Sequence, residues 1–104
     1  MTVGAWLSAR EPAPPRRLVA RIESAVGAEL ATAELPAAES LLGACASLLR
    51  DVVGRPSAGR ESALDLLAAD ALATYALEAA ADTPGWLEPG AQDAMRRIAA
   101  IANE

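Results

Sequence analysis

The sequence predicts an all-α protein, a compact bundle of about four helices with a short N-terminal helix or arm. Apolar residues make up 53% of the 104 residues and charged residues 22%, a composition that favours folding over disorder. Alanine, which loses no side-chain entropy in a helix, dominates the sequence. The β-branched and aromatic residues that strands favour are scarce, with two Trp, one Tyr and no Phe.

The N-terminal helix or arm is expected over residues 1–14. Thr2 is suited to cap a short helical segment, and the proline-rich stretch at residues 11–15 then interrupts regular structure. A chain of this length can form one hydrophobic core but not two. We therefore expect a single helical domain over residues 1–104.

Four main helices are expected from the hydrophobic periodicity, at about residues 15–26, 36–53, 58–81 and 89–102. The 15–26 helix repeats apolar residues on one face, and Gly27 is suited to end it. The 36–53 helix is the most regular, with a continuous apolar arc of Leu41, Leu42, Cys45, Leu48, Leu49, Val52 and Val53. The apolar face expected for the 89–102 helix contains Ala91, Ala94, Met95, Ile98, Ile101 and Ala102.

The 58–81 helix is unusual because its apolar residues form two separate arcs. The first arc contains Leu64, Ala68, Ala71, Leu72 and Tyr75, and we expect the 36–53 and 89–102 helices to cover it. The second arc contains Leu66, Ala69, Ala73, Leu77 and Ala80. A surface helix of a monomer needs only one apolar face, so the second arc requires a contact of its own.

The first functional hypothesis is a non-catalytic protein–protein interaction or oligomerisation module. Its partner would be a second copy of the chain or another helical protein. The candidate interface is the second arc of the 58–81 helix: Leu66, Ala69, Ala73, Leu77 and Ala80. A purely structural alternative is that the N-terminal arm covers this arc, with Trp6 packed on Leu66 or Leu77.

The second hypothesis is a small-molecule-binding helical domain or a small enzyme. Asp70 interrupts an otherwise apolar run, and Tyr75 and Trp86 lie near it in the expected bundle. These three residues are the candidates for lining an apolar pocket. The duller interpretation of Asp70 is that it lies in a solvated strip between the two arcs, and we favour this one because an unpaired buried charge is costly.

Catalytic and metal chemistry is constrained by the absence of histidine. Ser-His-Asp and Cys-His catalysis and His-containing metal sites are excluded. The single cysteine, Cys45, lies in the apolar arc of the 36–53 helix and is interpreted as core packing. Glu61 and Asp65 form an i,i+4 carboxylate pair, which we interpret as a solvated acidic face. No catalytic residue, cofactor or metal ion is therefore expected.

Charge is unevenly distributed along the chain. Residues 1–60 contain seven arginines and six acids, whereas residues 61–104 contain two arginines and eight acids. We expect the acids of the 58–81 helix to pair with arginines of the first half, in particular Arg50, Arg55 and Arg60.

The net charge of −5 and the hydropathy limit which partners and which location are expected for this protein. A negative chain is unsuited to nucleic acid or to an anionic membrane surface. No apolar stretch reaches the roughly 18 residues needed to span a bilayer, and no signal peptide is visible. The expected location is the cytoplasm.

Overall fold

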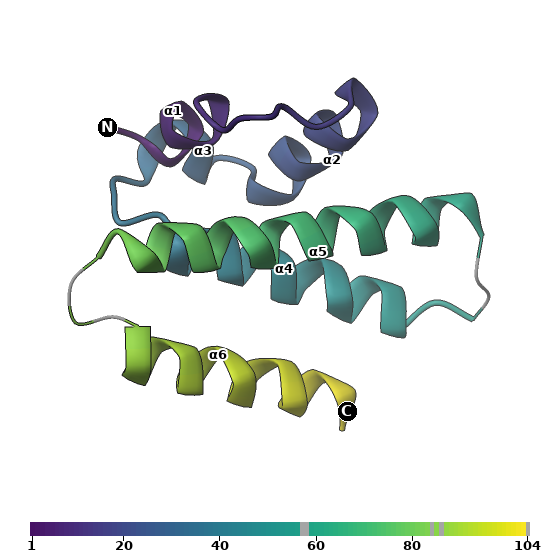
Figure 1. The fold of residues 1–104 in the computed structure, drawn as a ribbon. Helices are drawn as coiled ribbons and strands as arrows, with labels where there is room; N and C mark the ends of the chain where they lie inside the picture. The colour runs from purple at the N-terminus through teal and green to yellow at the C-terminus, as the bar shows by residue number, and fades with distance from the viewer. Residues whose placement is uncertain (57–58, 84, 86, 104) are drawn as a thin grey trace.

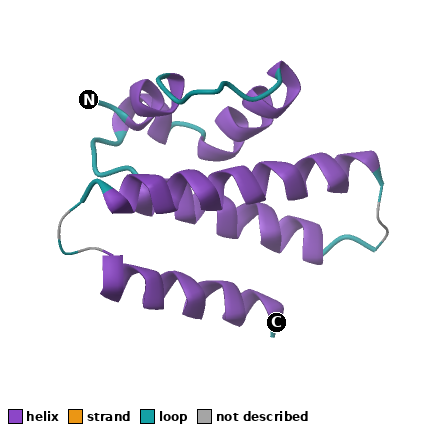
Figure 2. Ribbon diagram, in the orientation of Figure 1, coloured by secondary structure: helices purple, strands orange, loops and turns teal. Residues whose placement is uncertain are grey.

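The computed structural model of the chain describes residues 1–56, 59–83, 85 and 87–103, with the side chains of 87–91 left out. Its described residues form α-helices and no strand, which confirms the all-α fold class (Figures 1 and 2). The helices are α1 (Val3–Ser8), α2 (Arg16–Val26), α3 (Glu29–Thr32), α4 (Ala38–Val53), α5 (Arg60–Ala81) and α6 (Leu87–Ala102). The four long helices agree with the predicted ones to within two residues at each end.

The centre of the fold is the antiparallel pair α4 and α5, with α1, α2 and α3 on one side and α6 on the other (Figure 1). Leu41, Leu48 and Leu72 are fully buried there, and each contributes about 1.5–3 kcal/mol through burial. Between them the two helices meet through small residues: Ala44, Cys45, Ala68, Ala69 and Ala76. Small side chains let helix backbones approach closely, and the Cys45 thiol donates a 3.3 Å hydrogen bond to the Ala69 carbonyl.

The N-terminal segment is part of the fold because backbone hydrogen bonds hold it to the residues after α3. The Val3 amide donates to the Ala33 carbonyl at 2.9 Å, and the Thr2 hydroxyl accepts from the Ala5 amide at 3.1 Å. The predicted cap at Thr2 is thus confirmed. Gly27 ends α2 at a φ of 65°, a conformation that glycine adopts without strain.

Both arcs of α5 contribute residues to one buried strip, and the outer residues of each arc lie on either side of it. The polar residues Ser62 and Asp65 belong to this strip and are buried. The prediction that α6 covers the first arc is wrong. It lies over the second arc, where Ala73 and Leu77 form a groove with it, while α1 and α2 cover the Tyr75 side.

Some side chains that were expected on apolar faces are exposed instead. Met95 was expected on the buried face of the last helix but is 71% exposed, and Val53 is 59% exposed at the end of α4. The short α3 was not predicted, because four residues are too few for a hydrophobic period. Ile101, by contrast, is buried as expected.

The contact of α1 with α3 depends on Gly4. A Cβ atom at this position would lie 2.6 Å from the Leu30 carbonyl oxygen, which is rigid backbone. Gly4→Ala is expected to lower the free energy of unfolding by about 1–3 kcal/mol, because the two helices must move apart. Urea denaturation followed by circular dichroism measures this change.

Gly43→Ala is the matched control, since Gly43 lies within α4 and a Cβ atom added there would have no neighbour within 4 Å. Alanine there is expected to raise the free energy of unfolding by about 0.5–1 kcal/mol through helix propensity. Equal effects of the two substitutions would contradict the close approach of α1 and α3.

Candidate functional site

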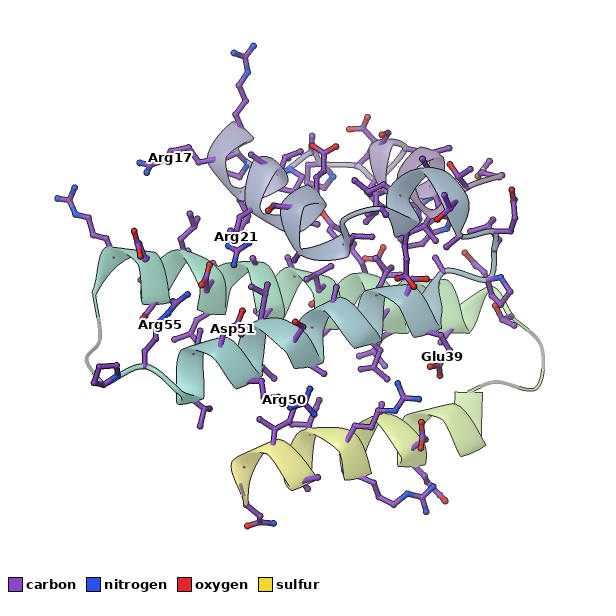
Figure 3. The ribbon with its side chains drawn as sticks, turned by 180° about the vertical axis from the view of Figure 1, so that it is seen from behind. Arg17, Arg21, Glu39, Arg50, Asp51 and Arg55 are labelled. Atoms are coloured by element: carbon purple, nitrogen blue, oxygen red, sulfur yellow. The ribbon has the colours of Figure 1, made fainter. Side chains whose placement is uncertain are left out.

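The most buried charge among the described residues is the Asp65 carboxylate, whose side chain is 4% exposed. It accepts hydrogen bonds from two arginines that come from different segments. The Nε atom of Arg21 on α2 binds Oδ1, and the Nη2 atom of Arg55, just after α4, lies 2.7 Å from Oδ2. Arg55 also donates to the Ser62 hydroxyl at 3.3 Å. Figure 3 shows both arginines at the same end of the central helix pair.

This ion-pair cluster shifts the protonation equilibria of its members. The hydrogen bond from Arg21 lowers the pKa of Asp65, with a further lowering by Arg55, while burial opposes both. The same hydrogen bond raises the pKa of Arg21. The carboxylate is therefore ionised and fully engaged, and the cluster links α2, α4 and α5.

The predicted environment is wrong for Asp65 and agrees with the structure for Asp70. The interpretation of Asp65 as part of a solvated face is wrong, because it is buried within the α5 strip. Asp70 is exposed, in agreement with the solvated interpretation of that residue. The expected pairing of α5 acids with arginines of the first half is confirmed for Arg55, and Arg21 adds a partner that the sequence did not single out.

An apolar groove lies on the surface between α5 and α6, with α4 as its floor. It encloses about 260 Å³, and every residue that lines it is apolar: Leu42, Ala73, Ala76, Leu77, Ala94, Met95 and Ile98. Its walls are open to solvent, with Leu77 59%, Met95 71% and Ile98 38% exposed. Such a groove can accept apolar side chains but offers no polar group to orient a small ligand.

A salt bridge holds α6 on α4 at the side away from the groove. Arg97 Nη2 lies 3.0 Å from the Glu39 carboxylate, and its Nε atom lies 3.0 Å from that of Asp93. These side chains are about half exposed, so each pair is worth at most about 1 kcal/mol. The groove width therefore depends mainly on the apolar contacts of α6, such as the buried Ile101.

The five candidate interface residues divide into two sets. Ala69 and Ala80 are buried against the rest of the chain, and Ala73 is partly buried at the groove. Leu66 and Leu77 remain 48% and 59% exposed. The chain thus covers the alanines of the second arc and leaves its leucines in solvent.

The three candidate pocket residues are not brought together around one pocket. Tyr75 packs edge-to-face on Trp6, with ring centroids 6.3 Å apart, and lines a cavity on the N-terminal side of α5. Asp70 is exposed and is not among the residues that line this cavity or the groove. Trp86 lies outside the described residues. The aromatic contact of Trp6 is therefore with Tyr75, while Leu66 and Leu77 stay exposed.

Sequence reasoning did not single out Met95 and Ile98 as members of a surface groove. Both share the apolar face of α6 with Ile101, and periodicity alone cannot say which edge of such a face stays uncovered. Asp65 had a usable signal, because Ala68, Ala69 and Leu72 follow it at helical spacings of three, four and seven. A carboxylate on the same side as three buried residues needs a buried partner.

Comparisons of this chain with protein families, with curated proteins and with solved structures find no match. None of the described helices is both long enough and apolar enough to cross a membrane. Within the same residues, no three side chains of the metal-ligating types gather into a cation site.

Removal of the central carboxylate tests the ion-pair cluster. Asp65→Asn is expected to lower the free energy of unfolding at pH 7 by about 2–4 kcal/mol, because two guanidinium groups lose their buried partner. Asp70→Asn makes the same charge change at an exposed position and is expected to stay within about 0.5 kcal/mol of wild type. Chemical denaturation of both variants measures the difference.

The pH dependence of the same variants gives a second measurement. The folded-state pKa of Asp65 is depressed, so its stabilising effect is complete above the unfolded-state pKa of about 3.9 and is lost as pH falls through the lower folded-state pKa. The stability difference between wild type and Asp65→Asn should therefore shrink below about pH 4. A stability difference between the two proteins that stays constant down to acid unfolding would show that the charge of Asp65 does not stabilise the fold.

Proposed function

We propose that this protein is a non-catalytic helical interaction module that forms a homodimer through α5 and α6. The observation that carries the proposal is the groove between these helices, which is lined by apolar residues and has exposed walls. Leu77 and Met95 stand at the two sides of the groove with more than half of each side chain in solvent. Burying one such side chain is worth about 1.5–3 kcal/mol, which favours a partner there.

A second copy of the chain suits this surface because the surface is self-complementary. The walls of the groove project apolar side chains, and alanines of α5 and α6 between them leave room for the side chains of a partner. In a two-fold arrangement with its axis along the helices, α5 of one copy lies against α6 of the other. The leucine of each α5 then faces the groove of the partner, and every contact forms twice.

The exposed charges beside the groove agree with this arrangement. Asp70 lies on α5 near the Leu66 and Leu77 side, and Arg96 follows Met95 on the exposed side of α6. Opposite charges therefore flank the two helices that are placed face to face, whereas packing α5 on its own mate would oppose like charges. Such rim charges act mainly on orientation and association rate.

The size of the surface indicates a weak dimer. A helix of 16 residues is about 24 Å long, and two neighbouring helices are about 20 Å wide, which gives a face on the order of 500 Å². Stable dimers usually bury about 800 Å² per partner. We therefore expect a concentration-dependent equilibrium between monomer and dimer.

Sedimentation equilibrium or light scattering over a range of concentrations tests the dimer. The wild-type mass is expected to rise toward twice 10.6 kDa with increasing concentration. The double variant Leu66→Arg/Leu77→Arg is expected to remain monomeric, because four arginines cannot be buried in an apolar contact.

The double variant Val53→Arg/Leu67→Arg is the matched control. It adds the same charge at side chains that are 59% and 58% exposed and that lie outside both the groove and the second arc, to which Leu66 and Leu77 belong. It should dimerise like the wild type. A wild-type chain that stays monomeric at millimolar concentration, or a Leu66→Arg/Leu77→Arg variant of unchanged mass, refutes the proposal.

A further inference from the structure

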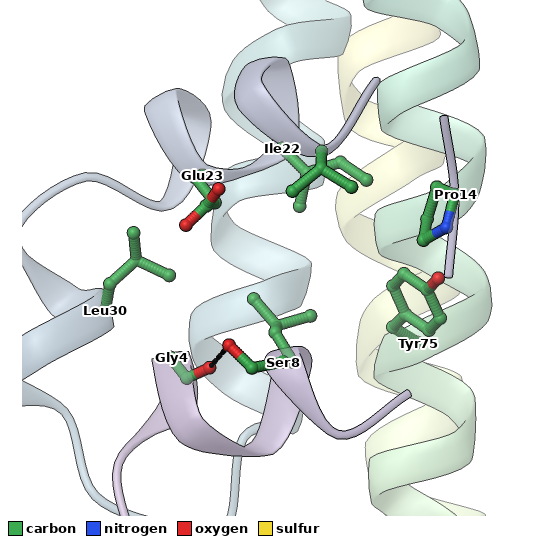
Figure 4. A pocket seen from close by; sticks show the side chains of 9 residues that line it. Gly4, Ser8, Pro14, Ile22, Glu23, Leu30 and Tyr75 are labelled. Atoms are coloured by element: carbon green, nitrogen blue, oxygen red, sulfur yellow. Dashed lines mark hydrogen bonds between the residues drawn. The ribbon is translucent and has the colours of Figure 1, made fainter. Parts of the chain in front are cut away.

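A second cavity lies on the opposite side of α5, in the N-terminal half of the fold. At 100° per residue, Tyr75 and Leu77 point to opposite sides of the helix, so this cavity is separate from the groove. It measures about 90 Å³ and is enclosed by parts of α1, α2, α3 and α5 together with Pro14. Figure 4 shows Glu23 and Leu30 on one side of it and Pro14 and Tyr75 on the other.

The inner walls of the cavity are aliphatic. They come from three helices and consist of Leu7, Val19, Ile22 and Leu30. Ile22 is 4% exposed and belongs to the hydrophobic core, so this wall is fixed by core packing rather than by a surface side chain. The interior therefore suits an apolar group.

The polar groups of the cavity are mostly hydrogen-bond acceptors. The Glu23 carboxylate is exposed at the mouth and forms no ion pair with any residue in the described part of the chain. The Ser8 hydroxyl donates to the Gly4 carbonyl at 2.9 Å, which leaves its oxygen free to accept. The Tyr75 hydroxyl can accept as well as donate. No basic side chain lines the cavity, so its polarity matches a cationic donor.

We propose that this cavity binds a small organic cation, with a short alkyl tail among the aliphatic walls and an ammonium group at the Glu23 carboxylate. A cavity of about 150 Å³ holds benzene in a well-known engineered protein, so a cavity of this smaller size takes a tail of about four carbons. The ammonium group stays at the mouth, where it remains partly hydrated and gains a charge-assisted hydrogen bond. This binding is independent of the homodimer, because the groove residues take no part in it.

Three four-carbon probes separate the contributions of charge and tail. n-Butylammonium and 1-butanol have the same butyl chain, butyrate has a propyl chain and the same total of four carbons, and the three differ in charge at pH 7. Titrations followed by ¹H–¹⁵N NMR are expected to give saturable shifts at the amides of Leu7, Ile22 and Leu30 with n-butylammonium. Binding of a ligand this small is expected on the order of millimolar, with about tenfold weaker binding of 1-butanol and none of butyrate.

Glu23→Gln is the decisive variant, because it keeps the size of the side chain and removes the charge. It should bind n-butylammonium and 1-butanol with affinities within about twofold of each other. Glu29→Gln removes a charge that is also exposed, on α3 and outside the cavity, and should retain the preference for the cation. The proposal is overturned if the cavity amides do not shift saturably, if wild type binds the alcohol as well as the cation, or if Glu29→Gln behaves like Glu23→Gln.

Discussion

The close packing of α5 on α4 is the contact on which every other element depends. The two helices meet through alanines and Cys45, and the sulfur of Cys45 reaches the backbone carbonyl of Ala69. Bulkier residues along this seam would separate the helices, because interiors are packed too tightly to absorb extra volume. Helix α2 then lies across one side of the pair and α6 along the other (Figure 1).

Asp65 fixes the position of the alanine-rich α4–α5 pair relative to the N-terminal helices. Alanine faces are similar along their length, so apolar packing alone distinguishes poorly between neighbouring positions of α2. A single buried carboxylate that must meet both Arg21 and Arg55 favours one position. Such a cluster therefore orients the helices more than it stabilises the fold, since the desolvation of the charged groups offsets much of their mutual attraction. Small side chains also leave room for the groove beside α6, where Ala73, Ala76 and Ala94 lie between the larger residues.

The long helices were predictable from the sequence because their apolar period extends over many turns. Ile22, Leu41 and Leu48 fall on these regular apolar faces, and all three are buried. The position of α6 was not predictable, because α5 offers apolar residues on both sides and sequence alone does not rank them. The candidate site shows the same limit: the exposure of Leu77 follows from which helix covers it, and the partners of Asp65 lie 44 and 10 residues away.

The sulfur of Cys45 acquires a particular chemistry from its place in the seam. Burial raises the pKa of the Cys45 thiol, with a further rise from Asp70, so little thiolate forms while the helices are in contact. Oxidants and alkylating reagents attack the thiolate, and they reach it only when α4 and α5 separate. A sulfinic acid formed during such an opening would carry a charge into the seam and prevent its closure. Irreversible oxidation of this one sulfur atom would then keep α4 and α5 permanently separated.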